Sequence, residues 1–212
     1  MSELSRQKTD IVSAKLSKEV NMYPSREEAE RILASALKCN PGPWGNHSRV
    51  AAVCAERIAS QCDGMNSERA YILGLLHDIG RKFGKGHLKH VSDGFRYMSQ
   101  LGYDEAARIC LTHSFGTGRF SEYIGNIDVA DEEVKLIKSE LEKTEFDDYD
   151  KLIQLCDCLA GSDGVVDIEE RMKDVKQRYG SYPQDKWDKN LELKSYFEAK
   201  AGGNIYDVVA GN

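Results

Sequence analysis

Two strong metal ligands, His77 and Asp78, stand side by side at the end of the apolar segment 71–76. In a helix interior, neighbouring side chains diverge by roughly 100°. At a helix end that is soon followed by a glycine, here Gly80, the backbone can turn and aim both side chains at one point. An imidazole and a carboxylate buried beside the leucines of this segment are costly unless something satisfies them. The pair therefore predicts a partner elsewhere in the chain.

Three more polar residues are predicted to point inward. His47 shares a helical face with Val50, Cys54 and Ile58, and His113 shares one with Ala106, Ile109 and Cys110. Asp157 lies within the apolar stretch 152–156, where a carboxylate is rarely left unpaired. Each histidine alone fits a core imidazole bonded to a backbone carbonyl. Together with two inward aspartates, they form a ligand mix suited to Zn, Fe, Mn, Co or Ni.

His87 and His90 cannot be separated by periodicity. Both fall in a predicted helix whose apolar stripe is Leu88, Val91, Phe95 and Met98. His87 lies slightly closer to that stripe, which does not decide between the two. Gly94, one turn after His90, would let a substrate or another backbone come close.

A basic cluster follows the His-Asp pair and comprises Arg81, Lys82, Lys85 and Lys89. A solvated surface loop and a phosphate clamp fit this cluster equally well. In a clamp, Arg81 is best placed, because only two residues separate it from Asp78. The segment 84–86 is not a Walker loop, since it lacks both the GxxxxGK[ST] pattern and a preceding strand.

Nearly every segment that carries these residues is predicted to be helical, so an all-α fold is expected. The predicted helices cover about 25–38, 46–61, 66–78, 87–101, 104–113, 131–144, 148–160, 167–179 and 183–201. Loops at 40–45, 80–86 and 114–130 separate them, and a short tail follows Gly203. No pair of segments alternates as strands do. Residues 1–20 are polar and fit a loosely held leading helix.

Composition restricts the class of protein. The chain has 212 residues, of which 41% are hydrophobic, so a single domain with a sizeable hydrophobic core is expected. The main part of this domain is expected at about 40–165, followed by a helical extension at 166–212. The net charge of −6 argues against nucleic acid as a partner. Six cysteines without a CxxC pair, no signal peptide and no membrane-length apolar run favour a reduced cytoplasmic protein without a membrane partner.

The ordered motifs resemble the HD superfamily of metal-dependent phosphohydrolases over residues 46–160. The segments that carry this resemblance are Asn46-His-Ser-Arg-Val-Ala51, Leu75-Leu-His-Asp-Ile-Gly-Arg81, Leu111-Thr-His-Ser114 and Leu155-Cys-Asp-Cys-Leu-Ala160. The resemblance implies an all-α helical bundle with extra N- and C-terminal helices. The tail 196–209 is similar to that of uncharacterised bacterial HD-domain proteins.

The same resemblance implies a ligand set. One divalent metal would be bound by His47, His77, Asp78 and Asp157; Mn, Fe, Co, Ni, Zn and Mg are not distinguished. Members with two metals add two histidines, with the aspartate of the pair as bridge; His113 fits the second of them. The His-x-x-x-Gly spacing to Gly94 is similar to that of two-metal relatives, and on this likeness alone His90 is preferred to His87.

The implied activity is hydrolysis of a small phosphomonoester, such as a nucleotide, by a metal-activated water. Asp78 and Arg81 would be catalytic, and Arg81 and Lys82 would bind the substrate. Many relatives have lysine at the position of Arg81, so the charge is kept but a proton donor is not. A di-iron oxygenase and a non-catalytic binding module are the alternatives, and a homodimer stays open. The Gly-Tyr-Pro signature of cyclic-dinucleotide phosphodiesterases is missing, which disfavours that activity.

Overall fold

The computed structural model describes residues 22–211, in which the chain forms ten α-helices and two short 3₁₀ helices. In this range no strand forms, and the one β-bridge joins Ala160 to Val165. The all-α prediction is therefore confirmed. The predicted leading helix at 1–20 lies outside the described residues. Between residues 22 and 211, no helix combines the length and apolarity that crossing a membrane requires.

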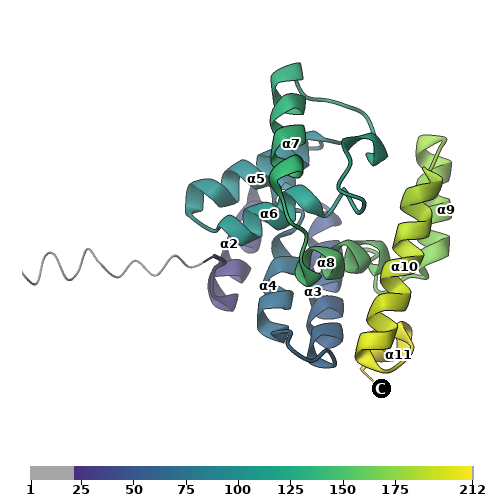
Figure 1. Cartoon of the computed structure of the whole chain (residues 1–212). Helices are drawn as coiled ribbons and strands as arrows, with labels where there is room; N and C mark the ends of the chain where they lie inside the picture. Colours follow the sequence, from purple (N-terminus) through teal and green to yellow (C-terminus); the bar gives the residue numbers. More distant parts are fainter. Residues whose placement is uncertain (1–21, 212) are drawn as a thin grey trace, which may run out of the picture.

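The helices follow one another with short connections (Figure 1). In chain order they are α2 (Arg26–Cys39), α3 (Trp44–Ser60), α4 (Ser67–Leu76), η1 (Ile79–Phe83), α5 (Lys89–Leu101), α6 (Asp104–Thr112), η2 (Phe120–Glu122), α7 (Asp131–Lys143), α8 (Asp148–Leu159), α9 (Ile168–Tyr179), α10 (Gln184–Ala201) and α11 (Ile205–Ala210). Three of them differ from expectation. The basic loop starts with η1, α5 begins at Lys89 and leaves His87 outside it, and the predicted tail contains α11.

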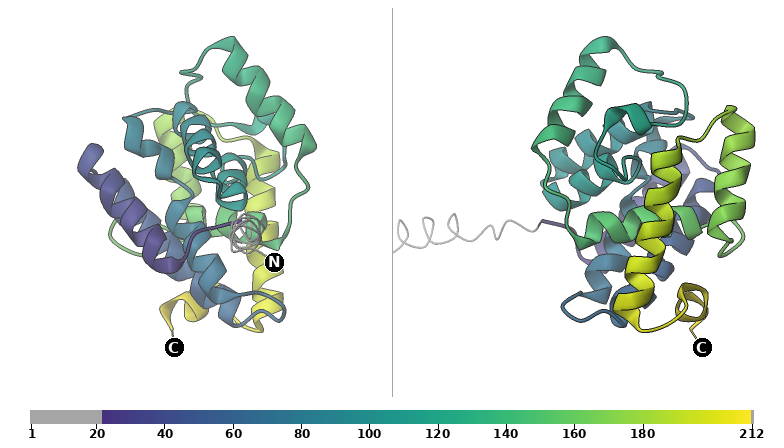
Figure 2. Two further views of the ribbon diagram at one scale, coloured as in Figure 1. Left: turned by 90° about the vertical axis from the view of Figure 1, so that its left-hand side faces the viewer. Right: turned by 45° about the vertical axis from the view of Figure 1, so that its right-hand side comes forward.

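The core lies around α3, α4 and α8, which pack against one another in the middle of the bundle (Figure 2). Their inward faces are apolar, and Ile58, Leu75 and Leu155 are fully buried. A smaller cluster around Leu88 and Phe115 fixes the loop after α6 beneath α7. This arrangement buries the ends of α4 and α6, where His77 and His113 are located.

Two glycines bring the turn after Asp78 against α5. A Cβ atom on Gly80 would lie only 1.9 Å from the carbonyl oxygen of His90, and one on Gly94 would lie 3.3 Å from the amide nitrogen of Gly80. No larger residue fits at Gly80, because backbone atoms fill the space. Gly94 thus admits another backbone, one of the two alternatives expected from the sequence. The contact places Asp78 beside His90.

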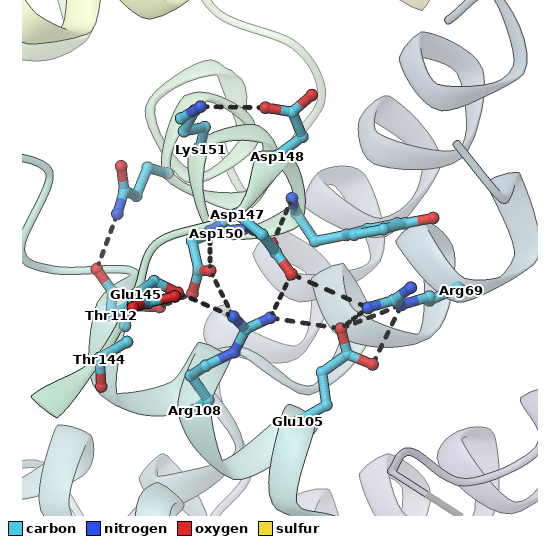
Figure 3. Close-up of polar contacts among 12 residues, drawn as sticks. Arg69, Glu105, Arg108, Thr112, Thr144, Glu145, Asp147, Asp148, Asp150 and Lys151 are labelled. Carbon is cyan, nitrogen blue, oxygen red and sulfur yellow. Dashed lines mark hydrogen bonds and ion pairs between the residues drawn. The ribbon is translucent and has the colours of Figure 1, made fainter. Parts of the chain in front are cut away.

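A partly buried ion-pair network ties α4, α6 and the start of α8 together (Figure 3). Glu105 accepts hydrogen bonds from Arg69 and lies 3.4 Å from Arg108. Arg108 also binds Asp147 at 2.7 Å and Asp150 at 3.0 Å. Glu105 and Asp150 are almost fully buried. The network joins the helix that precedes His113 to the helix that carries Asp157.

The C-terminal helices cover one flank of the bundle. Figure 1 shows α9 and α10 side by side, connected by a short turn, and both contact α8. Within α9 only Ile168 and Met172 are buried. The helix therefore rests on a narrow apolar stripe, and its remaining faces are free for polar residues.

Candidate metal centre

Three predicted ligands from distant segments meet at the inner end of α3, and we call them the His47 group: His47, His77 and Asp157. The Nε2 atom of His47 lies 3.3 Å from that of His77. The Oδ1 atom of Asp157 lies 2.9 Å from His47 Nε2 and 3.8 Å from His77 Nε2. The carboxylate of Asp78 is also close enough to join His47 and His77 around one ion.

A second set, the His90 group, consists of Asp78, His90 and His113. The Oδ1 atom of Asp78 lies 3.1 Å from His90 Nε2 and 3.7 Å from His113 Nε2. The two imidazole nitrogens are 3.2 Å apart. All three side chains are buried. Asp78 thus belongs to both sets of ligand atoms that could hold a metal ion.

His87 is not brought to this centre. Because α5 begins at Lys89, His87 precedes the helix, and its ring lies against Tyr179. Its backbone carbonyl accepts a hydrogen bond from the Nδ1 atom of His90. His87 thus contacts the centre only as a support for the neighbouring imidazole.

Backbone carbonyls fix the tautomer that each of the four imidazoles adopts when it is neutral. Each Nδ1 atom faces a carbonyl oxygen, at 2.9 Å for His47, 2.7 Å for His77 and 2.9 Å for His113, and His90 makes the same contact with His87. A carbonyl can only accept, so the proton resides on Nδ1 and the neutral ring has its lone pair on Nε2. Metal-binding histidines are oriented in this way.

The converging nitrogens fit a divalent cation. Two pairs of Nε2 atoms approach to 3.2–3.3 Å, and in the neutral rings both members of each pair present lone pairs. Such pairs repel each other unless a proton or a metal ion lies between them. Imidazole and carboxylate ligands suit the transition metals from Mn to Zn. The donor set therefore fits one ion at each group, with Asp78 shared.

The surroundings of Asp78 and Asp157 favour the ionised form of both carboxylates. Burial alone would raise the pKa of Asp78, but Arg81 and His90 hold it well below its ordinary value. Burial likewise opposes ionisation of Asp157, and the imidazoles of the His47 group lower its pKa well below the usual range. Burial and neighbouring imidazoles lower the pKa of His113 to about 3. At neutral pH both carboxylates are ionised and His113 is neutral.

Arg81 and Lys82 point to different places, because successive residues of a 3₁₀ helix are about a third of a turn apart. The Nε atom of Arg81 lies 2.5 Å from Asp78 Oδ2, and its side chain is largely buried. The ammonium of Lys82 lies over the ring of Tyr97, 4.0 Å from its centre. The structure thus brings Arg81 to the centre and leaves Lys82 away from it.

Both groups open into a cavity of about 460 Å³. Its floor holds the ligands and Arg81, namely His47, Asp78, Arg81, His90, His113 and Asp157. Trp44, Tyr123 and Ile124, from the segments 40–46 and 114–130, add apolar surface. A pocket with a few converging polar groups on a partly apolar wall is the usual form of a small-molecule site.

Comparison with known families agrees with this geometry. The family model of the HD domain matches residues 44–162, more than half of the chain. The chain belongs to the HD-domain family. HD domains are commonly metal-dependent phosphohydrolases, so a metal-dependent hydrolase type of function is indicated. Searches of curated proteins and of solved structures returned no match to the chain.

Helices beyond the matched HD domain complete the cavity, which the sequence did not predict. Three cations line it from α9 and α10: Arg171, Arg178 and Lys186. Gln154 of the HD domain also faces it; its amide donates to the carbonyl of Thr112, and its Oε1 atom has no partner among residues 22–211. Helical periodicity orients a residue within its own helix, but it does not tell which neighbour a helix faces.

Proposed function

We propose that this HD-domain protein is a metal-dependent phosphohydrolase that acts on a small phosphomonoester, such as a nucleotide. One observation supports the proposal most strongly. Asp78 lies within reach of two imidazole pairs, lines a cavity, and is bound by the partly buried guanidinium of Arg81. A cation placed beside an anionic metal ligand can neutralise charge on a phosphoryl group.

Six side chains would hold the metal: His47, His77 and Asp157 at one position, His90 and His113 at the other, and Asp78 at both. Divalent ions bound there would supply a water of lowered pKa and neutralise phosphoryl oxygens. The chain itself contributes the orientation. Backbone carbonyls fix the four rings, and the contact between Gly80 and α5 fixes the carboxylate of Asp78.

Arg81 would have two roles. Its Nε atom orients Asp78, and its side chain lines the cavity, with one terminal nitrogen at 3.5 Å from the carbonyl of Gly86. A guanidinium stays protonated, so it binds phosphoryl oxygens by charge-assisted hydrogen bonds and donates no proton to a leaving group. The aromatic and apolar wall around Trp44 and Tyr123 would contact the organic part of the substrate.

Phosphate release from a panel of nucleotides and sugar phosphates tests the proposal. Protein stripped with EDTA should be inactive, and adding back Mn²⁺, Co²⁺, Ni²⁺ or Zn²⁺ one at a time should restore release with at least one of them. Asp63→Asn, a change at an exposed carboxylate, is the control and should keep full activity. No release with any metal would refute the proposal. Consumption of O₂ by anaerobically purified, iron-loaded protein would then favour the oxygenase alternative.

A further inference from the structure

Arg171 of α9 lines the cavity, and its positive charge has no counter-ion among residues 22–211. Its side chain is partly buried and lines the same cavity as Asp78 and Asp157. Among residues 22–211, its guanidinium makes no hydrogen bond or ion pair, whereas Arg178 on the same helix is paired with Asp174 at 2.8 Å. A partly buried guanidinium without a counter-ion is costly, so an anion that enters the cavity would find a partner there.

A second cation, Lys186 of α10, lines the same cavity as Arg171. The ammonium of Lys186 donates to the carbonyl of Ser114 at 2.6 Å, which leaves its other protons free. Arg171 and Lys186 line the same cavity as Asp78 and Asp157. They belong to α9 and α10, and neither helix supplies a metal ligand.

The charges that line the cavity do not balance within the protein. Its two carboxylates, Asp78 and Asp157, are held by imidazoles and by Arg81. Arg171 and Lys186 have no carboxylate partner in the described part of the chain. Arg81 at the metal centre and the two cations on α9 and α10 are therefore two separate places where an anionic group can bind.

We propose that Arg171, assisted by Lys186, binds a second anionic group of the ligand, so that the substrate is a phosphomonoester with a further phosphate or carboxylate. The identification of this ligand as the substrate rests on the proposed phosphohydrolase function. A guanidinium suits either group, because both offer two oxygens to its fork of N–H donors. Substrate choice would then depend on α9, outside the segment 44–162 that the family model matches.

Binding of inorganic phosphate to EDTA-treated protein tests the site without any activity. Calorimetry should detect phosphate binding to the wild type, and Arg171→Gln should weaken it by about 10- to 100-fold, the usual value of a charged hydrogen bond. Lys173→Gln is the matched control. Lys173 is on the same helix, exposed and paired with Glu170, and it does not line the cavity. Absence of phosphate binding, or equal binding by wild type and Arg171→Gln, would overturn the proposal.

Kinetics of the metal-loaded protein identify the second group. Alkanediol bisphosphates and ω-phosphoalkyl carboxylates of increasing length are compared with the corresponding monophosphates. At one length, kcat/KM should exceed that of the monophosphate by about tenfold or more in the wild type and in Lys173→Gln, but not in Arg171→Gln. Which series shows the advantage tells phosphate from carboxylate.

Failure of the two proposals can be told apart. Phosphate binding that depends on Arg171, without hydrolysis of any ester, would keep the anion site and refute the phosphohydrolase. Hydrolysis of monophosphates with no advantage for any doubly anionic substrate would keep the phosphohydrolase and refute the second anionic group.

Discussion

Two clusters of buried charges lie in this protein, and they differ in whether they neutralise themselves. In the network of Arg69, Glu105, Arg108, Asp147 and Asp150, cations and carboxylates alternate, and every carboxylate has a guanidinium or backbone donor (Figure 3). In the metal centre, four imidazoles point their Nε2 atoms at one another and at two carboxylates. The first cluster is closed, whereas the second offers its ligand atoms to a proton or a metal ion.

Both clusters contain charged side chains, so residue types alone do not tell which one stabilises the fold and which one serves the chemistry. Whether the charges are neutralised within the cluster does tell them apart. A closed network of buried ion pairs is costly to break, since removing one partner leaves another charge buried and unpaired. An open cluster of ligands is maintained by its surroundings: backbone carbonyls fix the rings, and Gly80 and Gly94 fix the turn. Substitutions should therefore reduce stability in the first cluster and activity in the second.

Asp78→Asn should have the largest effect, because it removes the one ligand that both metal positions share. Phosphate release should fall by about 10³-fold or more, since even residues that only orient metal ligands are worth 10- to 100-fold. Initial rates at saturating metal measure the loss, and near-UV circular dichroism of the metal-free variant should match that of the wild type. An Asp78→Asn protein within tenfold of wild-type activity would be incompatible with a shared ligand.

Arg108→Met should reduce stability and leave the chemistry intact. It leaves Glu105 and Asp150 buried without their common cation, so the free energy of unfolding should fall by about 3 kcal/mol. Urea denaturation measures this change. Arg31→Met, which breaks an exposed pair on α2, is the control and should cost less than about 1 kcal/mol. Equal losses of unfolding free energy in the two variants would mean that the network does not stabilise the fold.

Arg81→Gln and Lys82→Gln differ by one position and should behave oppositely. Loss of the guanidinium next to Asp78 should lower kcat/KM by about 100-fold, as for other groups that neutralise developing charge. Lys82 lies over Tyr97, so its replacement should leave kcat/KM unchanged. A comparable loss in both variants would show that general positive charge in this turn, and no particular contact, supports activity.

The pH dependence of stability should show a second effect of the closed network. Burial raises the pKa of Asp150 from 3.8 to about 6. Because the folded-state pKa is the higher one, the contribution of this group to stability is fully present below about pH 4 and is lost as the pH rises through 6. At 1.36 kcal/mol per pKa unit, about 3 kcal/mol of folding stability is at stake. Urea denaturation from pH 4 to 7 should show this loss of stability in the wild type relative to Asp150→Asn. If the unfolding free energies of the two proteins changed with pH in parallel, the raised pKa of Asp150 would be contradicted.

Much of the metal centre could be predicted from the sequence. Helical periodicity places His47 and His113 on inward faces, and the end of a helix lets the backbone turn so that His77 and Asp78 point to one place. Where α5 begins could not be read from its apolar stripe. The structure starts it at Lys89 and so turns His87 away from the centre.

The cations of α9 and α10 were missed for another reason. Arg171 and Lys186 lie on different helices, and only the packing of these helices against α8 brings them to the same cavity. The closed network was missed likewise, since the burial of Glu105 and Asp150 depends on how α4, α6 and α8 meet. The local sequence pattern predicted the helices and their inward faces. Which side chains from different helices come together depends on tertiary contacts, which the pattern does not contain.

The number of metal ions per chain tests the central claim most directly. Protein loaded with a divalent metal that supports activity and then desalted is measured by inductively coupled plasma mass spectrometry. Two ions per chain are predicted for the wild type and for Asp150→Asn, whose changed residue belongs to the closed network, while Asp78→Asn should lose both. A wild-type chain that binds no ion would contradict the metal centre itself, and two ions retained by Asp78→Asn would contradict the shared role of Asp78.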